Sequence, residues 1–161
     1  MLKTGPVAKE PTRSQLEEPD LGDLPATLSA MAAAHAGWCN LQPVPTEEAE
    51  APLATDTSFL RLFRASGPLL PLCTWVAPNA RQKPPHVELG IRHGAGPKAA
   101  KRLEIPDRWV VLDDHPKRGI VVAVPPDIDA DESLHWLLAA GRVLSRVPLT
   151  TRWLVEVYAS T

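Results

Sequence analysis

Two short apolar segments joined by a turn constrain the fold of this chain more than any other feature of its sequence. Residues 108–113 read RWVVLD and residues 119–124 read GIVVAV, and DHPKRG at 114–119 joins them through a proline-initiated turn that Gly119 closes. Runs of this length that are rich in β-branched residues favour strands, so we expect an antiparallel hairpin. Since both segments are apolar on both faces, we expect them in the middle of a sheet that is covered on both sides.

The other periodic segments predict an α+β domain with a mixed, largely antiparallel sheet of about five to six strands, packed by two main helices. The first helix is expected at 25–36, where Pro25 stands near the first turn and Gly37 ends the pattern. The second, at 129–146, has acidic residues at its start and arginines near its end, as the helix dipole favours. Further strands are expected at 37–45, 69–76, 86–92 and 152–158.

Two features of the middle segment leave its structure open. Residues 58–66, SFLRLFRAS, alternate imperfectly and fit either a strand paired with 69–76 or a short capped helix that ends at Gly67. We favour the strand. Pro71 has no N–H to donate, so it predicts that the strand at 69–76 lies at a sheet edge or carries a bulge.

The N-terminal part differs from the rest in composition and charge. Residues 1–22 are charged, rich in proline and without a sustained period, which predicts a disordered acidic tail before a single domain at 23–161. Residues 45–57 are expected to form a flexible loop within that domain. Residues 1–57 hold three basic and nine acidic groups, a net charge of −6, and the remainder carries +4. The tail therefore stays free, docks on a partner or folds back on its own basic domain.

The first residues, MLKTGPVAKEP, contain no apolar leader, and nowhere do about 18 apolar residues follow one another. We therefore expect a cytoplasmic protein without a membrane segment, in which Cys39 and Cys73 stay reduced as small buried side chains. The abundance of Ala, Arg, Pro, Val and Leu indicates a high-GC bacterial genome.

A glycine turn between an expected strand and a short helix is the first candidate site. Its sequence is RHGAGPKAAKRL at 92–103, and glycines at such a turn leave backbone N–H groups available to an anion. The turn is not a P-loop, because the spacing differs and alanine follows Lys98, leaving no hydroxyl to bind magnesium. The alternative is a solvated basic turn without a ligand. The candidate residues for a phosphorylated or acidic ligand are Arg92, His93, Gly94, Gly96, Lys98, Lys101 and Arg102.

A carboxylate and an imidazole adjoin in the predicted hairpin turn. Asp114 and His115, with Arg118 nearby, offer residues for general acid–base catalysis. No GxSxG elbow or other supported nucleophile accompanies them. An exposed turn needs polar residues in any case, so a small enzyme ranks third among the functions considered.

The sequence indicates no metal site, no cofactor and no nucleic-acid interface. Its five histidines and two cysteines form none of the CxxC, HxxxH or HExxH spacings. Residues 81–102 hold six basic groups, but no aromatic side chain lies among them to stack on bases.

The long helix has apolar side chains on two faces, which together span roughly 220°, more than a helix on a sheet usually buries. One of these faces carries Trp136, Ala140 and Val143 and predicts a contact with a second chain. We therefore expect a non-catalytic accessory or interaction protein that binds another protein or itself, as a homodimer. Binding of a phosphorylated or acidic ligand at 93–98 is the alternative, and an enzyme using Asp114 and His115 is the third.

Overall fold

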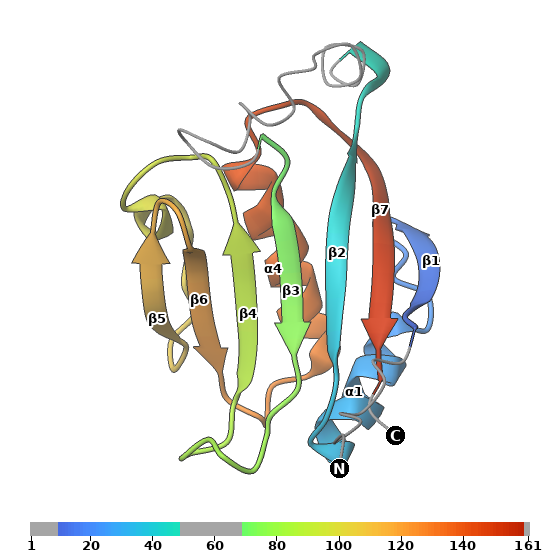
Figure 1. Cartoon of the computed structure of the whole chain (residues 1–161), viewed down its shortest axis with the longest axis vertical. Coiled ribbons are helices and arrows are strands. Elements are labelled where there is room, and N and C mark those ends of the chain that lie inside the picture. The colour runs from blue at the N-terminus through green and yellow to red at the C-terminus, as the bar shows by residue number, and fades with distance from the viewer. Residues whose placement is uncertain (1–9, 49–68, 160–161) are drawn as a thin grey trace, which may run out of the picture.

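The computed structural model describes residues 10–48 and 69–159, which form one sheet with two α-helices behind it (Figure 1). The helices are α1 (Leu24–Ala34) and α4 (Ala130–Leu144), and a short 3-10 helix, η1, spans Ala99–Arg102. The strands are β1 (Thr12–Glu17), β2 (Trp38–Pro45), β3 (Leu72–Val76), β4 (Val87–Arg92), β5 (Val110–His115), β6 (Gly119–Val124) and β7 (Leu149–Tyr158).

The sheet is antiparallel throughout, in the order β1-β7-β2-β3-β4-β6-β5. Its α+β class agrees with the prediction, and its seven strands are slightly more than the five to six expected. The predicted helices and the strands at 37–45, 86–92 and 152–158 all form, with ends that differ by a few residues. In the described part of the chain, no helix is both long and apolar enough to cross a membrane.

The core lies between the helices and the face of the sheet that they cover, here called the covered face. Alternate residues of each strand point into it, such as Cys73 and Trp75 of β3, which are at most 1% exposed. Trp153 of β7 is fully buried and packs close to Gly141 of α4, where a Cβ atom would lie 3.1 Å from its ring. The other side of the sheet, the open face, carries the partly exposed residues between these positions, including Trp38 and Leu154.

Strand β1 corrects our prediction of a disordered tail over residues 1–22. It pairs with β7 over its whole length, and residues 1–9 lie outside the described residues. Leu16 is the buried residue of β1, and one apolar side chain leaves no alternation to detect in the sequence. Glu18, the first residue after β1, accepts hydrogen bonds from the guanidinium of Arg142 in α4 and from Trp153 Nε1 (3.1 Å). These long-range contacts, rather than local propensity, order the segment.

The predicted hairpin of β5 and β6 forms, but its position in the sheet differs from our expectation. β6 also pairs with β4, whereas β5 lies at the sheet edge and pairs, among the described residues, with β6 alone. Because the helices cover one face of the sheet, Val110 and Leu112 of β5 remain 55% and 50% exposed. The expectation that both faces are covered was therefore wrong, since an apolar run does not reveal which strand ends a sheet.

Strand β3 was predicted to lie at a sheet edge or to carry a bulge. It lies instead between β2 and β4 in the centre of the sheet, and its pairings with both show no register shift. It begins at Leu72, directly after Pro71, so the missing N–H of the proline falls outside the ladder. The strand expected at 58–66 and residues 49–57 of the expected loop lie outside the described residues.

Candidate functional site

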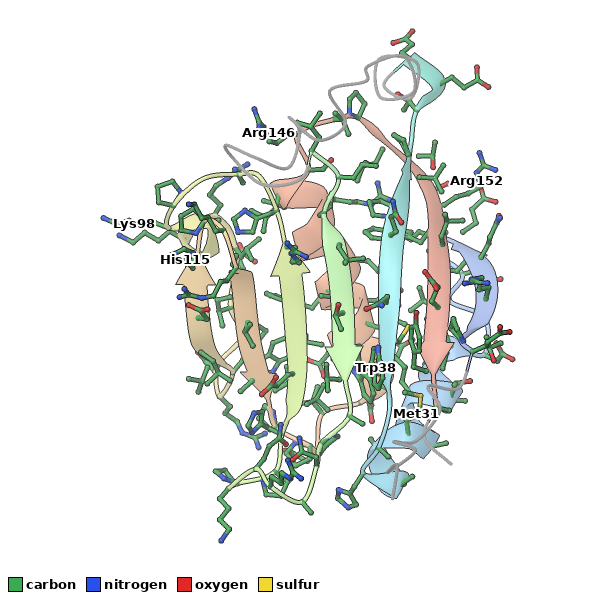
Figure 2. The ribbon with its side chains drawn as sticks, viewed as in Figure 1. Met31, Trp38, Lys98, His115, Arg146 and Arg152 are labelled. Atoms are coloured by element: carbon green, nitrogen blue, oxygen red, sulfur yellow. The ribbon has the colours of Figure 1, made fainter. Side chains whose placement is uncertain are left out.

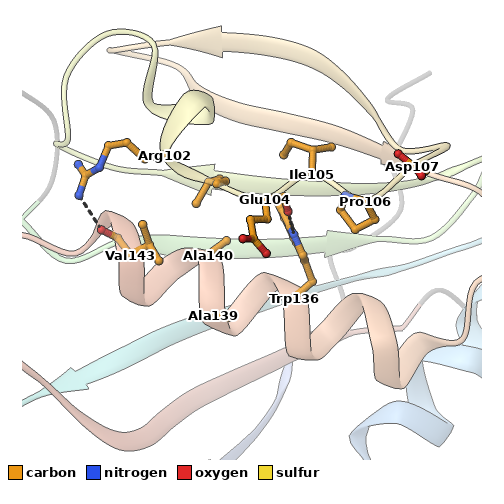
Figure 3. A pocket seen from close by; sticks show the side chains of 10 residues that line it. Arg102, Glu104, Ile105, Pro106, Asp107, Trp136, Ala139, Ala140 and Val143 are labelled. Atoms are coloured by element: carbon orange, nitrogen blue, oxygen red, sulfur yellow. Dashed lines mark hydrogen bonds between the residues drawn. The ribbon is translucent and has the colours of Figure 1, made fainter.

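A groove of about 680 Å³ lies between α4 and the segment that leads from η1 to β5 (Figure 3). Helix α4 forms one wall and the connecting segment forms the other. The lining residues are Trp136, Ala139, Ala140 and Val143 of α4, with Arg102, Leu103, Glu104, Ile105, Pro106 and Asp107 opposite.

The predicted interface face of the long helix forms this wall. Trp136, Ala140 and Val143 are spaced by four and three residues, which places them along one side of α4. The indole of Trp136 donates from Nε1 to the Glu104 carbonyl oxygen (2.7 Å) and meets the ring of Trp109 edge-on, with centroids 5.3 Å apart. Trp136 is thus held by its own chain, whereas Val143 is 45% exposed.

The two ends of the groove carry opposite charge. At one end the guanidinium of Arg102 donates to the Val143 carbonyl oxygen (3.0 Å), and at the other end lies the exposed carboxylate of Asp107 (Figure 3). Leu103 and Ile105 lie between them and pack against the core. The exposed carboxylate of Glu104 also lies between the two ends (Figure 3). The α4 wall is therefore apolar, whereas the opposite wall carries Glu104 and the ends carry Arg102 and Asp107.

The glycine turn packs against β5. Lys98 adopts a left-handed conformation with φ of 57°, and η1 after it is only four residues long. The backbone N–H of Ala100 donates to Asp114 Oδ2 (3.2 Å), so a carboxylate of the chain itself uses this donor. Lys98 and Lys101 remain exposed to solvent.

The seven residues predicted to bind an anion do not converge on one point. Arg92 follows the buried Ile91 in β4, so it projects from the open face, whereas Arg102 reaches α4 on the covered side. His93 is only 1% exposed. The structure therefore groups His93 and Arg102 on the covered side and leaves Arg92 apart from them.

The structure brings His93 close enough to Asp114 for the two charges to interact, which the sequence did not indicate. The Nδ1 atom of His93 accepts the N–H of Ala95 (3.1 Å), while its Nε2 atom and Asp114 Oδ1 are both buried without a hydrogen-bond partner among the described residues. Burial lowers the pKa of His93; the Asp114 carboxylate acts in the opposite direction, and Arg102 adds to the lowering. The burial of His93 could have been predicted from the alternation of side chains along a strand, because His93 follows the buried Ile91 of β4 by two residues.

The predicted acid–base pair of Asp114 and His115 points to opposite faces of β5, because adjacent residues of a strand alternate. His115 Nδ1 accepts the N–H groups of Lys117 (3.1 Å) and Arg118 (3.3 Å). Arg118 in turn pairs with Asp113 (Nε to Oδ2, 3.0 Å) and lowers the pKa of that carboxyl. These contacts stabilise the hairpin turn.

Cys39 and Cys73 are free and fully buried, as predicted. Burial raises the pKa of Cys39 to about 12 and also raises the pKa of Cys73, so neither thiol is a nucleophile at neutral pH. Within residues 10–48 and 69–159, no group of three or more His, Cys, Asp or Glu side chains is arranged to hold a metal ion.

A function must be argued from these sites, because fold alone does not imply one. Comparisons with protein-family models, with curated proteins and with solved structures found no match for this chain.

Proposed function

We propose that this chain is a non-catalytic interaction protein that receives a short segment of another protein in the groove between α4 and residues 102–107. The observation that carries this proposal is the partly exposed apolar wall. Val143 is 45% exposed, although its neighbours Ala140 and Leu144 in the same helix are buried. Partners anchor apolar side chains in grooves of this kind.

The dimensions of the groove suit a chain segment. Its volume of about 680 Å³ falls within the range of roughly 300–1,000 Å³ that is usual for binding pockets. From Trp136 to Val143 the helix rises by about 10 Å. An extended segment of about three residues covers that length.

The charges at the ends of the groove indicate the chemistry of the partner. An acidic group in the segment would pair with Arg102, and a basic group would pair with Asp107. Between them, one or two apolar side chains would lie against Trp136 and Val143. The proposed partner segment therefore has an apolar centre and opposite charges at its two ends.

The geometry gives less support to the two other functions considered. The Asp114 carboxylate occupies the Ala100 donor that an anion would need, and it would repel an anion at that place. Asp114 and His115 point to opposite faces of β5, so the two side chains cannot act together on one substrate as acid and base. We also place the protein in the cytoplasm, where the buried thiols of Cys39 and Cys73 would stay reduced.

Selection from a library of displayed peptides tests this function and does not require that the partner be identified first. We expect the full chain to enrich peptides with apolar residues between an acidic and a basic residue. Val143→Glu should lower the affinity for these peptides by at least about tenfold, since it places a charge on the apolar wall. Leu154→Glu is the matched control, because Leu154 is 41% exposed on the open face, away from the groove. This variant should bind the peptides as the wild type does.

Charge reversal supplies the second readout. Arg102→Glu should change the enriched peptides from an acidic to a basic residue at the corresponding end. Enriched peptides that bind the wild type and Val143→Glu equally well would refute the groove as the site. A library that yields no enriched sequence would also count against the proposed function.

A further inference from the structure

The edge strand β5 is unusually apolar for its position. Val110 and Leu112 are 55% and 50% exposed, the highest values among the large apolar side chains that the structure describes. Within the described ranges β5 pairs with β6 alone, so its outer side presents backbone N–H and C=O groups without strand partners. An edge of this kind is a template for a further strand.

The opposite edge of the sheet has a different character. Strand β1 exposes Arg13, Gln15 and Glu17, and charged side chains are one of the means by which natural sheets prevent edge-to-edge pairing. Strand β5 is uncharged over Val110–Leu112. Its charges lie in its C-terminal half, where Asp113 pairs with Arg118, and a register shift between Val111 and Asp113 interrupts its ladder with β6. The contrast between the two edges indicates that β5 is the edge that receives a strand.

The two ends of β5 carry opposite net charge. The hydrogen bond from Ala100 to Asp114 places η1 beside the C-terminal end of β5, and Figure 2 shows Lys98 and His115 at the same corner of the molecule. Exposed ion pairs at the two ends, Arg118 with Asp113 and Arg108 with Asp127, are each neutral. The remaining exposed charges are Lys98, Lys101, Arg102 and Lys117 at the C-terminal end, and Glu104 and Asp107 on the segment that enters the strand.

We propose that β5 pairs with β5 of a second copy of this chain, in antiparallel direction, to form a homodimer with one continuous sheet. A twofold antiparallel contact sets the basic end of each strand against the acidic entry segment of its partner. It also buries Val110 and Leu112 between the copies, while backbone hydrogen bonds join the two edges. A second copy fits this edge because the edge is complementary to itself. The contact shares Glu104 and Asp107 with the groove proposed above, whereas Val110 and Leu112 do not line that groove.

Sedimentation velocity of the full chain over a range of concentrations tests the dimer. The wild type should form dimers, and Val110→Lys and Leu112→Lys should each raise the dissociation constant at least about tenfold. The matched control is Leu154→Lys, which places the same charge at a 41% exposed leucine on an interior strand and should leave the dimer unchanged.

A charge exchange keeps the test decisive if a lysine in β5 prevents folding, which circular dichroism would reveal. Asp107→Lys and Lys117→Asp should each weaken the dimer, and the double variant should restore it, because the two ends meet across the twofold axis. A monomeric wild type would overturn the proposal, even if β5 were found to bind a strand of another protein. A dimer that survives both lysine variants, or that Leu154→Lys also dissociates, would overturn it as well.

Discussion

Replacing Gly119 with alanine tests how the β5–β6 hairpin is held against the sheet. Gly119 has φ of +94°, a left-handed conformation that costs alanine roughly 1–2 kcal/mol. A Cβ atom there would also lie 2.2 Å from the carbonyl oxygen of Ile91 and 3.1 Å from the Cα atom of Arg92. Both are backbone atoms of β4, so relief requires β4 and β6 to move apart. Overpacking of this kind costs about 1–3 kcal/mol, and we expect a total loss of about 2–5 kcal/mol in the free energy of unfolding.

Gly96→Ala is the matched control. Gly96 has φ of +86°, but a Cβ atom there would meet no other atom within 4 Å, so we expect only the conformational cost of about 1–2 kcal/mol. Urea unfolding followed by circular dichroism measures both variants. With a denaturant slope of about 2 kcal/mol/M, the clash should separate their midpoints by about 0.5–1.5 M. Equal midpoints would refute the reasoning, because the contact with Ile91 would then cost nothing.

Three further changes test the covered side of the sheet. The pKa of His93 lies below its ordinary value of 6.5, so the unfolded chain takes up a proton first as the pH falls. The folded state therefore loses stability below about pH 6.5. His93→Gln should flatten this loss in unfolding curves measured between about pH 7 and pH 5. Glu18→Gln removes the charged partner of Arg142 and should cost about 1–3 kcal/mol in urea unfolding, whereas an unchanged midpoint would show that this pair does not hold β1. Gly141→Ala would place its Cβ atom 2.8 Å from Cys73 Sγ and should lower the melting temperature, and adding Cys73→Ala should recover part of the loss.

The elements that could be predicted from the sequence are those with a strong local pattern. The β5–β6 hairpin follows from two apolar runs around a proline-glycine turn, and α4 follows from its long apolar periodicity. Strand β1 could not be predicted, because its order depends on β7 and on Arg142, both more than 120 residues away. A segment with a single buried leucine carries no signal of such distant partners.

The candidate site could be predicted only in part, for the same reason. The helical wall with Trp136 and Val143 followed from its spacing along α4. The opposite wall, residues 102–107, shows no periodicity, and only the hydrogen bond from Trp136 to the Glu104 carbonyl identifies it as the facing surface. The pair of titratable residues expected from neighbouring positions in the sequence also differs from the pair that the structure brings together. Asp114 lies beside His115 in sequence but is grouped with His93 in space, because alternation along a strand separates neighbours.

The sequence by itself determined that this chain forms an α+β domain with an antiparallel hairpin and a long apolar helix, since turn chemistry and side-chain periodicity act over a few residues. The tertiary structure decided which strands end the sheet, that its helices cover a single face, and which surfaces of α4 and β5 remain exposed. These outcomes depend on pairing between residues far apart in the chain, such as β1 with β7, which local patterns do not encode. Both proposed contact surfaces, the groove and the β5 edge, result from that long-range pairing and packing.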